Sequence, residues 1–182
     1  MFQFFKKYQK PLFEGLCDMH NHLLPSIDDG SKNVEMSSKM LEGYLALGFT
    51  SVIPTPHVYQ ELYPNTPETV KNAFGNFSKH CLKENSVKVP SYGAEYMVDE
   101  VFMKNLETGI PELLLKEKYI LLEINFFGAT TMLESACFQL QQKELRPILA
   151  HPERYRMIEG IAAYKALKNK GFYFQLNALS LM

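Results

Sequence analysis

The chain has 182 residues and a formal net charge of −1, and 46% of its residues are hydrophobic. This length fits one domain of ordinary size, and the apolar content supports a real core, which excludes a mainly disordered chain. Lys and Arg are spread along the sequence, so composition gives no sign of a nucleic-acid groove or a polyanionic partner. Cys17, Cys81 and Cys137 form no C-x-x-C motif, which predicts reduced thiols in a cytoplasmic protein.

Residues 1–17 are expected to be an N-terminal extension. The segment Met1–Pro11 is aromatic and basic but lacks the continuous apolar stretch and cleavage site of a signal peptide. We expect a short helix against the domain's own exterior, with adsorption to a membrane surface as the alternative. No run of residues is long enough for a transmembrane helix.

The first half of the chain alternates strand-like and helical patterns. A strand-like run ends in residues 18–22, the apolar spacing over 33–48 predicts a helix, and 50–57 is a short β-rich run. A second helix is predicted from residue 66, because Thr66 suits a cap and Pro67 a first helical position. Residues 87–98 predict a third strand. The second helix would place on one face Val70, Ala73, Phe74, Phe77 and Cys81.

The alternation continues in the second half. Residues 119–124 form an almost unbroken apolar run, as in a strand buried on both faces of a parallel sheet. Residues 131–134 have the capping-box form that precedes a helix, whose apolar face would hold Leu133, Ala136, Cys137 and Leu140. A strand over 146–151, a helix over 158–170 and a strand over 172–177 follow.

Six strands alternating with helices predict a β/α architecture, either an open doubly wound sheet or a barrel. Polar residues at the predicted strand ends favour the barrel, because a β/α barrel gathers the carboxyl ends of its strands on one face. Each such residue could separately be a hydrogen-bonded loop residue. Glu123 argues most strongly for a metal, since a carboxylate within an apolar strand is costly to bury without a cation or partner. The strand-end residues are His22, His57, Glu95, Glu123 and His151.

Residues 18–30 concentrate histidine and carboxylate side chains. In an extended strand Asp18, His20 and His22 would project from the same face. Imidazole and carboxylate are ligands that Zn, Mn and Fe accept. A polar loop with two incidental histidines is the alternative interpretation of this run.

Taken together, these motifs resemble the PHP superfamily, and within it the manganese-dependent protein-tyrosine phosphatases of bacterial capsule and exopolysaccharide loci. The resemblance runs from Asp18 to the end of the chain, and implies a domain over residues 18–182 with a distorted (β/α)7 barrel and up to three metal ions. The strings that carry it are D-M-H-N-H-L-L-P and I-D-D-G within residues 18–30, T-P-H at 55–57, Y-P-N-T at 63–66, G-A-E at 93–95, L-E at 122–123 and A-H-P-E-R-Y at 150–155.

The resemblance also implies roles for individual residues. Asp29 resembles a ligand to an outer ion, one glutamate is expected to bridge two ions, and the metal is expected to be manganese, with iron, zinc or magnesium as alternatives. Arg154 matches the arginine that meets the substrate phosphate, a role that suits a guanidinium fork; its alternative is a surface ion pair with Glu153 or Glu159. The implied metal ligands are His20, His22, Asp29, His57, Glu95, Glu123 and His151.

The chain departs from the family pattern near its end. The family's final strand carries an Asp-x-His pair, and no such pair follows residue 177 here. About six of the seven strands are therefore expected, leaving an open edge. A truncated chain is one explanation and a homo-oligomeric partner that covers the gap is the other.

With a competent site, a hydroxide held by the metal ions is expected to attack a phosphate monoester in line while Arg154 binds the phosphoryl oxygens. No cysteine is followed six positions later by Arg, as a C-x5-R thiol phosphatase requires, which supports metal chemistry. The expected substrate is a phosphotyrosine protein, the tail of a bacterial tyrosine kinase. A histidinol-phosphatase-like enzyme and a truncated, non-catalytic metal-binding module are the alternatives.

Overall fold

A computed structural model of the chain describes residues 13–82, 87–109, 111–125 and 130–181. The chain divides into two compact units, one of residues 1–56 and 68–92, the other of residues 57–67 and 93–182. The helix expected within Met1–Pro11 lies outside the described residues.

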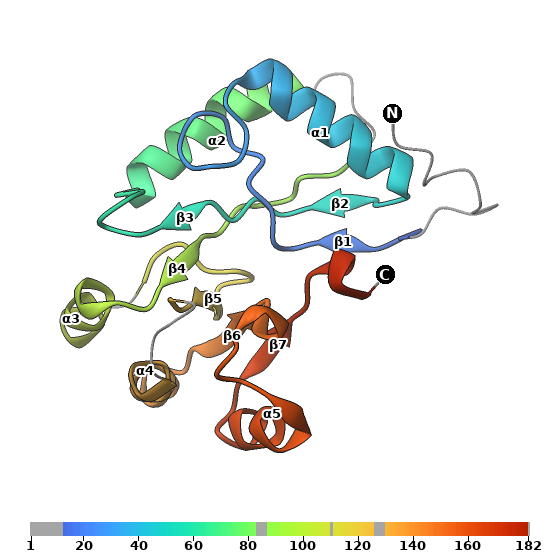
Figure 1. Cartoon of the computed structure of the whole chain (residues 1–182). Coiled ribbons are helices and arrows are strands. Elements are labelled where there is room, and N and C mark those ends of the chain that lie inside the picture. Colours follow the sequence, from blue (N-terminus) through green and yellow to red (C-terminus); the bar gives the residue numbers. More distant parts are fainter. Residues whose placement is uncertain (1–12, 83–86, 110, 126–129, 182) are drawn as a thin grey trace. The chain divides into compact units, whose positions relative to one another are not determined.

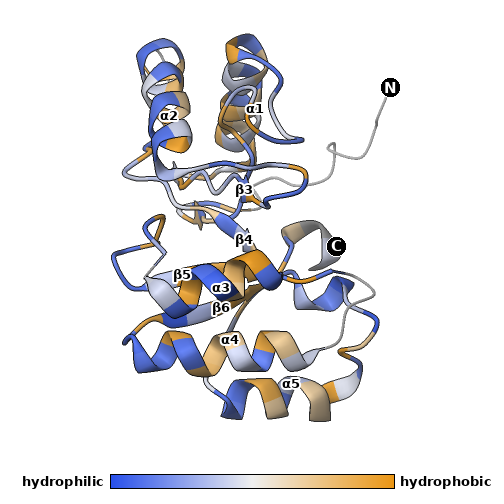
Figure 2. Ribbon diagram, turned by 90° about the vertical axis from the view of Figure 1, so that its left-hand side faces the viewer, coloured by the Kyte–Doolittle hydropathy of each residue, from blue (hydrophilic) through white to orange (hydrophobic). Residues whose placement is uncertain are grey.

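The first unit pairs two very short parallel strands and packs two helices together. Strand β1 (Cys17–Asp18) pairs with β2 (Ser51–Val52), in the register Cys17 to Ser51. Helices α1 (Val34–Leu47) and α2 (Pro67–Cys81) lie side by side (Figures 1 and 2). The predicted apolar face of α2 is confirmed, because four of its five residues are buried and Phe74 is half-buried.

Local sequence explains where α1 begins and ends. Its N-cap is Asn33, whose side-chain oxygen accepts a hydrogen bond from the Met36 N–H at 2.8 Å and so satisfies a free donor of the first turn. It ends at Leu47, and the C-cap Gly48 has φ of 94°, a left-handed conformation that glycine adopts without strain.

The second unit is built on a five-stranded parallel sheet, in the order β3-β4-β5-β6-β7. Helices α3 (Glu100–Thr108), α4 (Thr130–Gln142) and α5 (Gly160–Asn169) lie along one face of it (Figure 1). The predicted parallel α/β fold class is therefore confirmed. The strands are β3 (His57–Val58), β4 (Glu95–Met97), β5 (Tyr119–Glu123), β6 (Arg146–Ala150) and β7 (Tyr173–Gln175), and two short 3-10 helices are η1 (Pro152–Arg154) and η2 (Ala178–Leu181).

Side chains of strand β5 and of helix α4 are buried as the sequence predicts. Ile120, Leu121 and Leu122 of β5 are fully buried, as the unbroken apolar run predicts. All four residues of the predicted face of α4 are buried as well. Each helix carries both hydrophobic and hydrophilic residues (Figure 2), as expected of helices that cover a sheet with one face.

Several sequence predictions need correction. The strand expected over 50–57 is two strands, β2 and β3, because Pro54 and Pro56 between them lack the N–H that a ladder needs. Of the strand expected over 87–98 only β4 forms, while Lys88 makes an isolated bridge to Ser51. Residues 131–134 do not cap a helix, since α4 already includes Thr130.

Helix α3 was not predicted, although its start has a clear signal. Asp99 caps it, with its Oδ1 atom accepting a hydrogen bond from the Phe102 N–H at 2.7 Å. Phe102 and Leu106, four residues apart, are its buried face.

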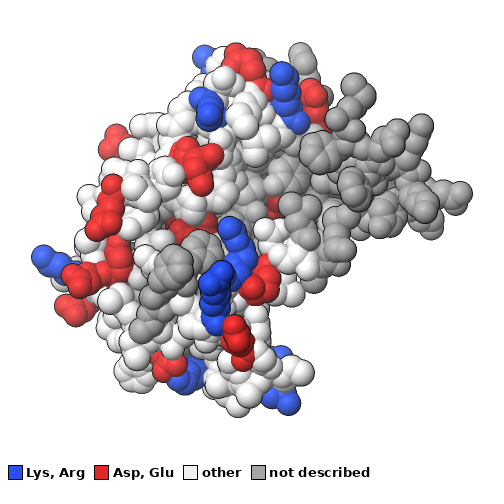
Figure 3. All heavy atoms as spheres, viewed as in Figure 1, with Lys and Arg blue, Asp and Glu red and all other residues white. Residues whose placement is uncertain are grey.

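Acidic and basic side chains are interspersed on the face seen in Figure 3. Among the described residues, none of the helices combines the length and the apolar character that crossing a membrane requires.

Candidate metal centre

Three of the predicted ligands converge on one face of the second unit's sheet. His57 begins β3, Glu95 begins β4 and Glu123 ends β5. In the parallel register His57 pairs with Glu95, and Met97, two residues further on, pairs with Glu123. Because side chains two residues apart share a face of a strand, Glu95 and Glu123 project from the same face. His57 and Glu95 thus begin short strands, although each was expected at or just beyond the carboxyl end of a strand.

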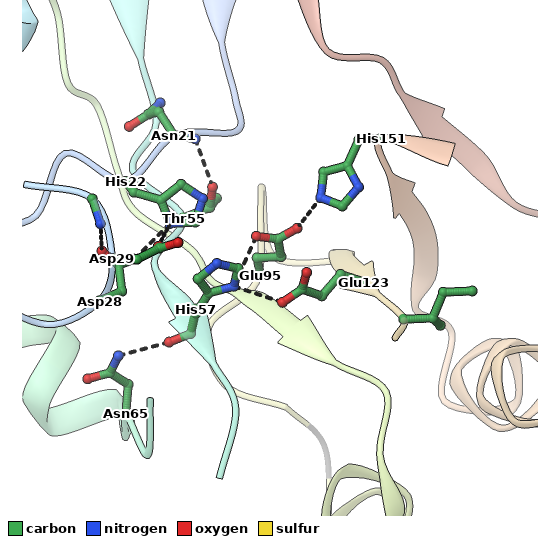
Figure 4. A network of polar contacts seen from close by, with 12 residues as sticks. Asn21, His22, Asp28, Asp29, Thr55, His57, Asn65, Glu95, Glu123 and His151 are labelled. Carbon is green, nitrogen blue, oxygen red and sulfur yellow. Dashed lines mark hydrogen bonds and ion pairs between the residues drawn. The ribbon is translucent and has the colours of Figure 1, made fainter. Parts of the chain in front are cut away.

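The donor atoms lie within contact distance of one another. The His57 Nδ1 atom is 2.8 Å from Glu123 Oε1 and 3.2 Å from Glu95 Oε2 (Figure 4). The other oxygen of Glu95, Oε1, is 3.0 Å from the Nε2 atom of His151. Glu95 therefore lies between two imidazoles, and His57 lies between two carboxylates.

Burial makes this cluster favourable for a cation. The Glu95 side chain is 0% exposed and that of Glu123 is 8% exposed. Two carboxylates with two neutral imidazoles carry a charge of about −2, which is costly away from water unless a cation compensates it. One nitrogen and two carboxylate ligands at this spacing form a group that could hold a metal ion, and such donors suit Mn, Fe and Zn. The residues present therefore fit a divalent metal.

His151 is held in position by its own backbone. It directly follows β6 and has φ of 32° and ψ of 53°, a left-handed conformation that turns the chain into η1. Its N–H donates a hydrogen bond to the side-chain oxygen of Gln175 at 3.2 Å, which ties it to β7. Arg154, at the end of η1, is exposed, and its N–H donates to the His151 carbonyl at 3.0 Å.

Tyr155 contacts the residues around this cluster, and it was assigned no role from the sequence although it ends the string A-H-P-E-R-Y. It is 2% exposed, and its hydroxyl accepts a hydrogen bond at 3.2 Å from the N–H of Ile124, next to Glu123. Its ring centroid is 5.5 Å from that of His151. Burial, with the negative charges of Glu123 and Glu95, raises the pKa of Tyr155 well above its ordinary value, so the phenol stays protonated.

Two residues of the Y-P-N-T string hold His57. The Tyr63 ring stacks on the His57 ring with centroids 5.3 Å apart and planes 12° apart. The side-chain amide of Asn65 donates to the His57 carbonyl at 2.8 Å (Figure 4). The sequence had marked this string by family resemblance, without a role for either residue.

In the first unit His22 is oriented by an aspartate. The His22 Nδ1 atom is 2.7 Å from Oδ2 of Asp28, whose side chain is 0% exposed, and 4.0 Å from Oδ1 of Asp29, whose side chain is 61% exposed. A carboxylate at Nδ1 fixes the tautomer in which Nε2 carries the lone pair that a metal ion would need. Asp28, which was not assigned a role, is therefore the orienting carboxylate, whereas Asp29 is exposed and lies farther from the ring.

The predicted face of Asp18, His20 and His22 does not form as expected. Strand β1 ends at Asp18, so both histidines lie beyond it. An Asp18 side-chain oxygen accepts the His20 N–H at 2.9 Å, which makes Asp18 a support for the loop. Burial raises the pKa of Asp18, while hydrogen bonds from the His20 backbone and the Tyr44 side chain oppose the shift.

The loop between the histidines and α1 is tightly closed. The Ser31 N–H donates to the His22 carbonyl at 3.0 Å, and the Gly30 N–H donates to Oδ1 of Asp28 at 3.0 Å. A Cβ at Gly30 would overlap the carbonyl oxygen and the Cβ of His22. Glycine at residue 30 is thus required for the loop to approach His22.

Parallel sheets with histidine and carboxylate groups beside the strands define a candidate metal-binding α/β protein. The model of the family described as "Capsular polysaccharide synthesis, CpsB/CapC" matches residues 16–182. The chain belongs to this CpsB/CapC family.

Named relatives agree with this family. Tyrosine-protein phosphatase YwqE of Bacillus subtilis is 31% identical over 167 residues, covering 91% of this chain and 66% of the relative. The putative tyrosine-protein phosphatase CapC of Staphylococcus aureus is 26% identical, with 92% and 66% covered. The chain therefore spans slightly less than two thirds of the length of these relatives.

A solved structure has the same fold. It comes from work on YwqE from Bacillus subtilis and CpsB from Streptococcus pneumoniae, described as unique metal-dependent tyrosine phosphatases. It matches with a TM-score of 0.80 and 31% sequence identity, covering 91% of this chain and 68% of the solved chain.

Proposed function

We propose that this protein is a metal-dependent protein-tyrosine phosphatase that acts in capsular polysaccharide synthesis. The observation that carries the proposal is the buried group of His57, Glu95 and Glu123, whose donor atoms converge as a divalent ion requires. The names of the relatives, tyrosine-protein phosphatases YwqE and CapC, supply the reaction. The proposed substrate is a phosphotyrosine in the tail of a bacterial tyrosine kinase.

The proposed metal ligands are those that the family resemblance implies. His57, Glu95, Glu123 and His151 would bind ions in the second unit. His20, His22 and Asp29 would be further ligands, in a distorted barrel of the PHP type. Manganese is the proposed metal. The family resemblance supports this full ligand set, and the carboxylate on His22 Nδ1 supports an Nε2 ligand there.

Residues of the chain itself would orient the substrate and bind its negatively charged phosphate group. A bound divalent ion lowers the pKa of water enough to supply hydroxide near neutral pH, and it stabilises negative charge on the phosphoryl group. Arg154 would bind two phosphate oxygens through its guanidinium fork, since it is exposed and lies three residues after His151. The fork stays charged at any working pH. Tyr155 would hold His151 in place, and Tyr63 would hold His57.

The test is hydrolysis of p-nitrophenyl phosphate and of a phosphotyrosyl peptide by protein that was treated with a chelator and then reloaded with manganese. We expect activity only after reloading and no loss on thiol alkylation. Glu123→Gln should abolish turnover and metal uptake, while Glu107→Gln, a matched change at an exposed residue of α3, should preserve both. Activity that survives the chelator but not alkylation would overturn the proposal.

The same experiment separates the alternatives. Faster turnover of histidinol phosphate than of the phosphotyrosyl peptide would favour the small-molecule phosphatase. Metal uptake, measured by elemental analysis, without hydrolysis of any phosphomonoester would favour the non-catalytic module.

A further inference from the structure

A pocket of about 270 Å³ lies within the second unit, beside the candidate metal centre. Its wall includes Val58, the residue after His57, and Asn65, whose amide holds the His57 carbonyl. Residues of β4, one side of α3 and the segment 111–113 form the other walls. The proposed centre and this pocket therefore share the short connection between β3 and α2.

The lining of the pocket combines acidic and aromatic groups. Asp99 and Glu112 contribute two carboxylates, and the part of the lining that the structure describes contains no Lys, Arg or His. Tyr96 and Phe102 contribute aromatic surface, with their ring centroids 5.7 Å apart. Because these described lining residues carry negative charge only, the pocket is complementary to a positively charged group.

The neighbouring helix start does not reverse this preference. The N-terminus of α3 carries a partial positive charge, which would favour an anion. Asp99 already caps this end, with Oδ1 accepting the Phe102 N–H at 2.7 Å. The Tyr96 hydroxyl is engaged as well, because it accepts the Leu113 N–H at 3.1 Å. Burial raises the pKa of Tyr96 to about 12, so it adds no charge at neutral pH.

We propose that this pocket binds the side chain of a lysine or arginine that lies close to the phosphotyrosine in the substrate. The aliphatic stem would pack on the aromatic walls, and the cationic head would meet Asp99 and Glu112. Because the residue after His57 lines the pocket and an extended peptide advances roughly 3.3 Å per residue, a residue one to three positions from the phosphotyrosine is the expected occupant. This specificity site rests on the proposed phosphatase function.

The test compares phosphotyrosyl peptides that are identical except for Arg, Lys or Gln at one position within three residues of the phosphotyrosine. We expect the manganese-loaded protein to prefer a basic peptide at one of these positions. Glu112→Gln and Asp99→Asn should lower kcat/KM for that peptide about five- to tenfold, as expected for loss of a charge-assisted contact. The Gln peptide and p-nitrophenyl phosphate should be unaffected, because they do not use the pocket.

Two features keep the result interpretable. Asn is as good an N-cap as Asp, so Asp99→Asn preserves the start of α3, and Glu107→Gln makes the same charge change elsewhere on this helix. Equal turnover of basic and neutral peptides by the unaltered protein, or an equal loss on all substrates in both variants, would overturn the specificity site alone. If the unaltered protein hydrolyses no phosphomonoester, the proposed function fails. Fluorescence anisotropy then measures whether the protein binds the Arg peptide more tightly than the Gln peptide. Equal affinity for the two peptides would refute the proposed pocket.

Discussion

The hydroxyl of Tyr155 accepts a hydrogen bond from the backbone N–H of Ile124 at 3.2 Å, inside the second unit. Ile124 follows Glu123, and the Tyr155 ring lies against that of His151. One aromatic side chain thus connects the ends of β5 and β6, each of which presents a candidate ligand.

Tyr155→Phe removes this acceptor and leaves the Ile124 N–H buried without it. We expect a loss of about 1–3 kcal/mol in the free energy of unfolding, the cost of one unsatisfied buried donor. Urea denaturation of the metal-free protein measures it. Tyr164→Phe, at a half-buried tyrosine of the same unit, is the control and should change stability much less. Equal effects of the two changes would argue against the role of this hydrogen bond.

Gly30→Ala should disrupt the loop that closes on His22. The added Cβ overlaps the backbone and Cβ of His22, and relieving such an overlap costs about 1–3 kcal/mol. Thermal unfolding gives the loss. Gly75→Ala in α2 is the matched control, since nothing lies within 4 Å of its Cβ; it should stabilise by about 0.5–1 kcal/mol. A Gly30→Ala protein that unfolds at the same temperature as the unaltered protein would contradict the close approach of this loop to His22.

Asp28→Asn should weaken metal binding without removing a proposed ligand. The amide cannot act as the charged acceptor at His22 Nδ1, so the tautomer and ring orientation are less well fixed. Loss of such a supporting carboxylate lowers metal affinity by about 10–100-fold. Titration with manganese measures this, with Glu35→Gln on α1 as the control for charge. Unchanged affinity would show that Asp28 does not orient a ligand.

Arg154→Ala should lower kcat/KM for p-nitrophenyl phosphate by roughly 10²–10³-fold, the scale for losing one preorganised group that stabilises the transition state. Arg154→Lys should recover only part of this, because lysine lacks the bidentate fork. Metal uptake should be unchanged in both variants. Arg156→Ala, at another exposed arginine nearby, is the control. If the two alanine variants lose activity equally, Arg154 has no specific role at the phosphate.

The cysteines should differ in reactivity and in their effect on alkaline stability. Burial raises the pKa of Cys137 from about 9 to about 11, whereas Cys17 is exposed. Iodoacetamide at pH 8 should therefore modify Cys17 before Cys137, as peptide mapping would show.

The raised pKa of Cys137 also fixes the sign of a pH effect. Below pH 9 the thiol is neutral in the folded and unfolded states, so its contribution is fully present. Between pH 9 and pH 11 the unfolded chain loses the proton first, so the folded protein loses stability as the pH rises. Cys137→Ala should make the stability less dependent on pH in this window. If Cys137→Ala leaves the pH dependence of stability unchanged, Cys137 is not the group that causes this loss of stability.

Local pattern was enough to predict much of the second unit. The apolar run at 119–124 and the buried face of α4 depend on residues close in the chain, so periodicity reveals them. The alternation of strands with helices likewise predicted the parallel sheet. Helix α3 shows the limit, because its two buried positions, Phe102 and Leu106, form too short a pattern to stand out.

By itself, the sequence determined which residue types are available for chemistry and where the longer helices and strands form, since both follow from composition and short-range spacing. Only the tertiary structure decided which of two adjacent aspartates meets His22, because Asp28 and Asp29 are equivalent in pattern and differ only in burial and distance. Likewise, Glu95 and Glu123 meet His57 through strand pairing, which joins residues far apart in the chain. Contacts between residues that folding brings together depend on their separation in space, so spacing along the chain does not specify them.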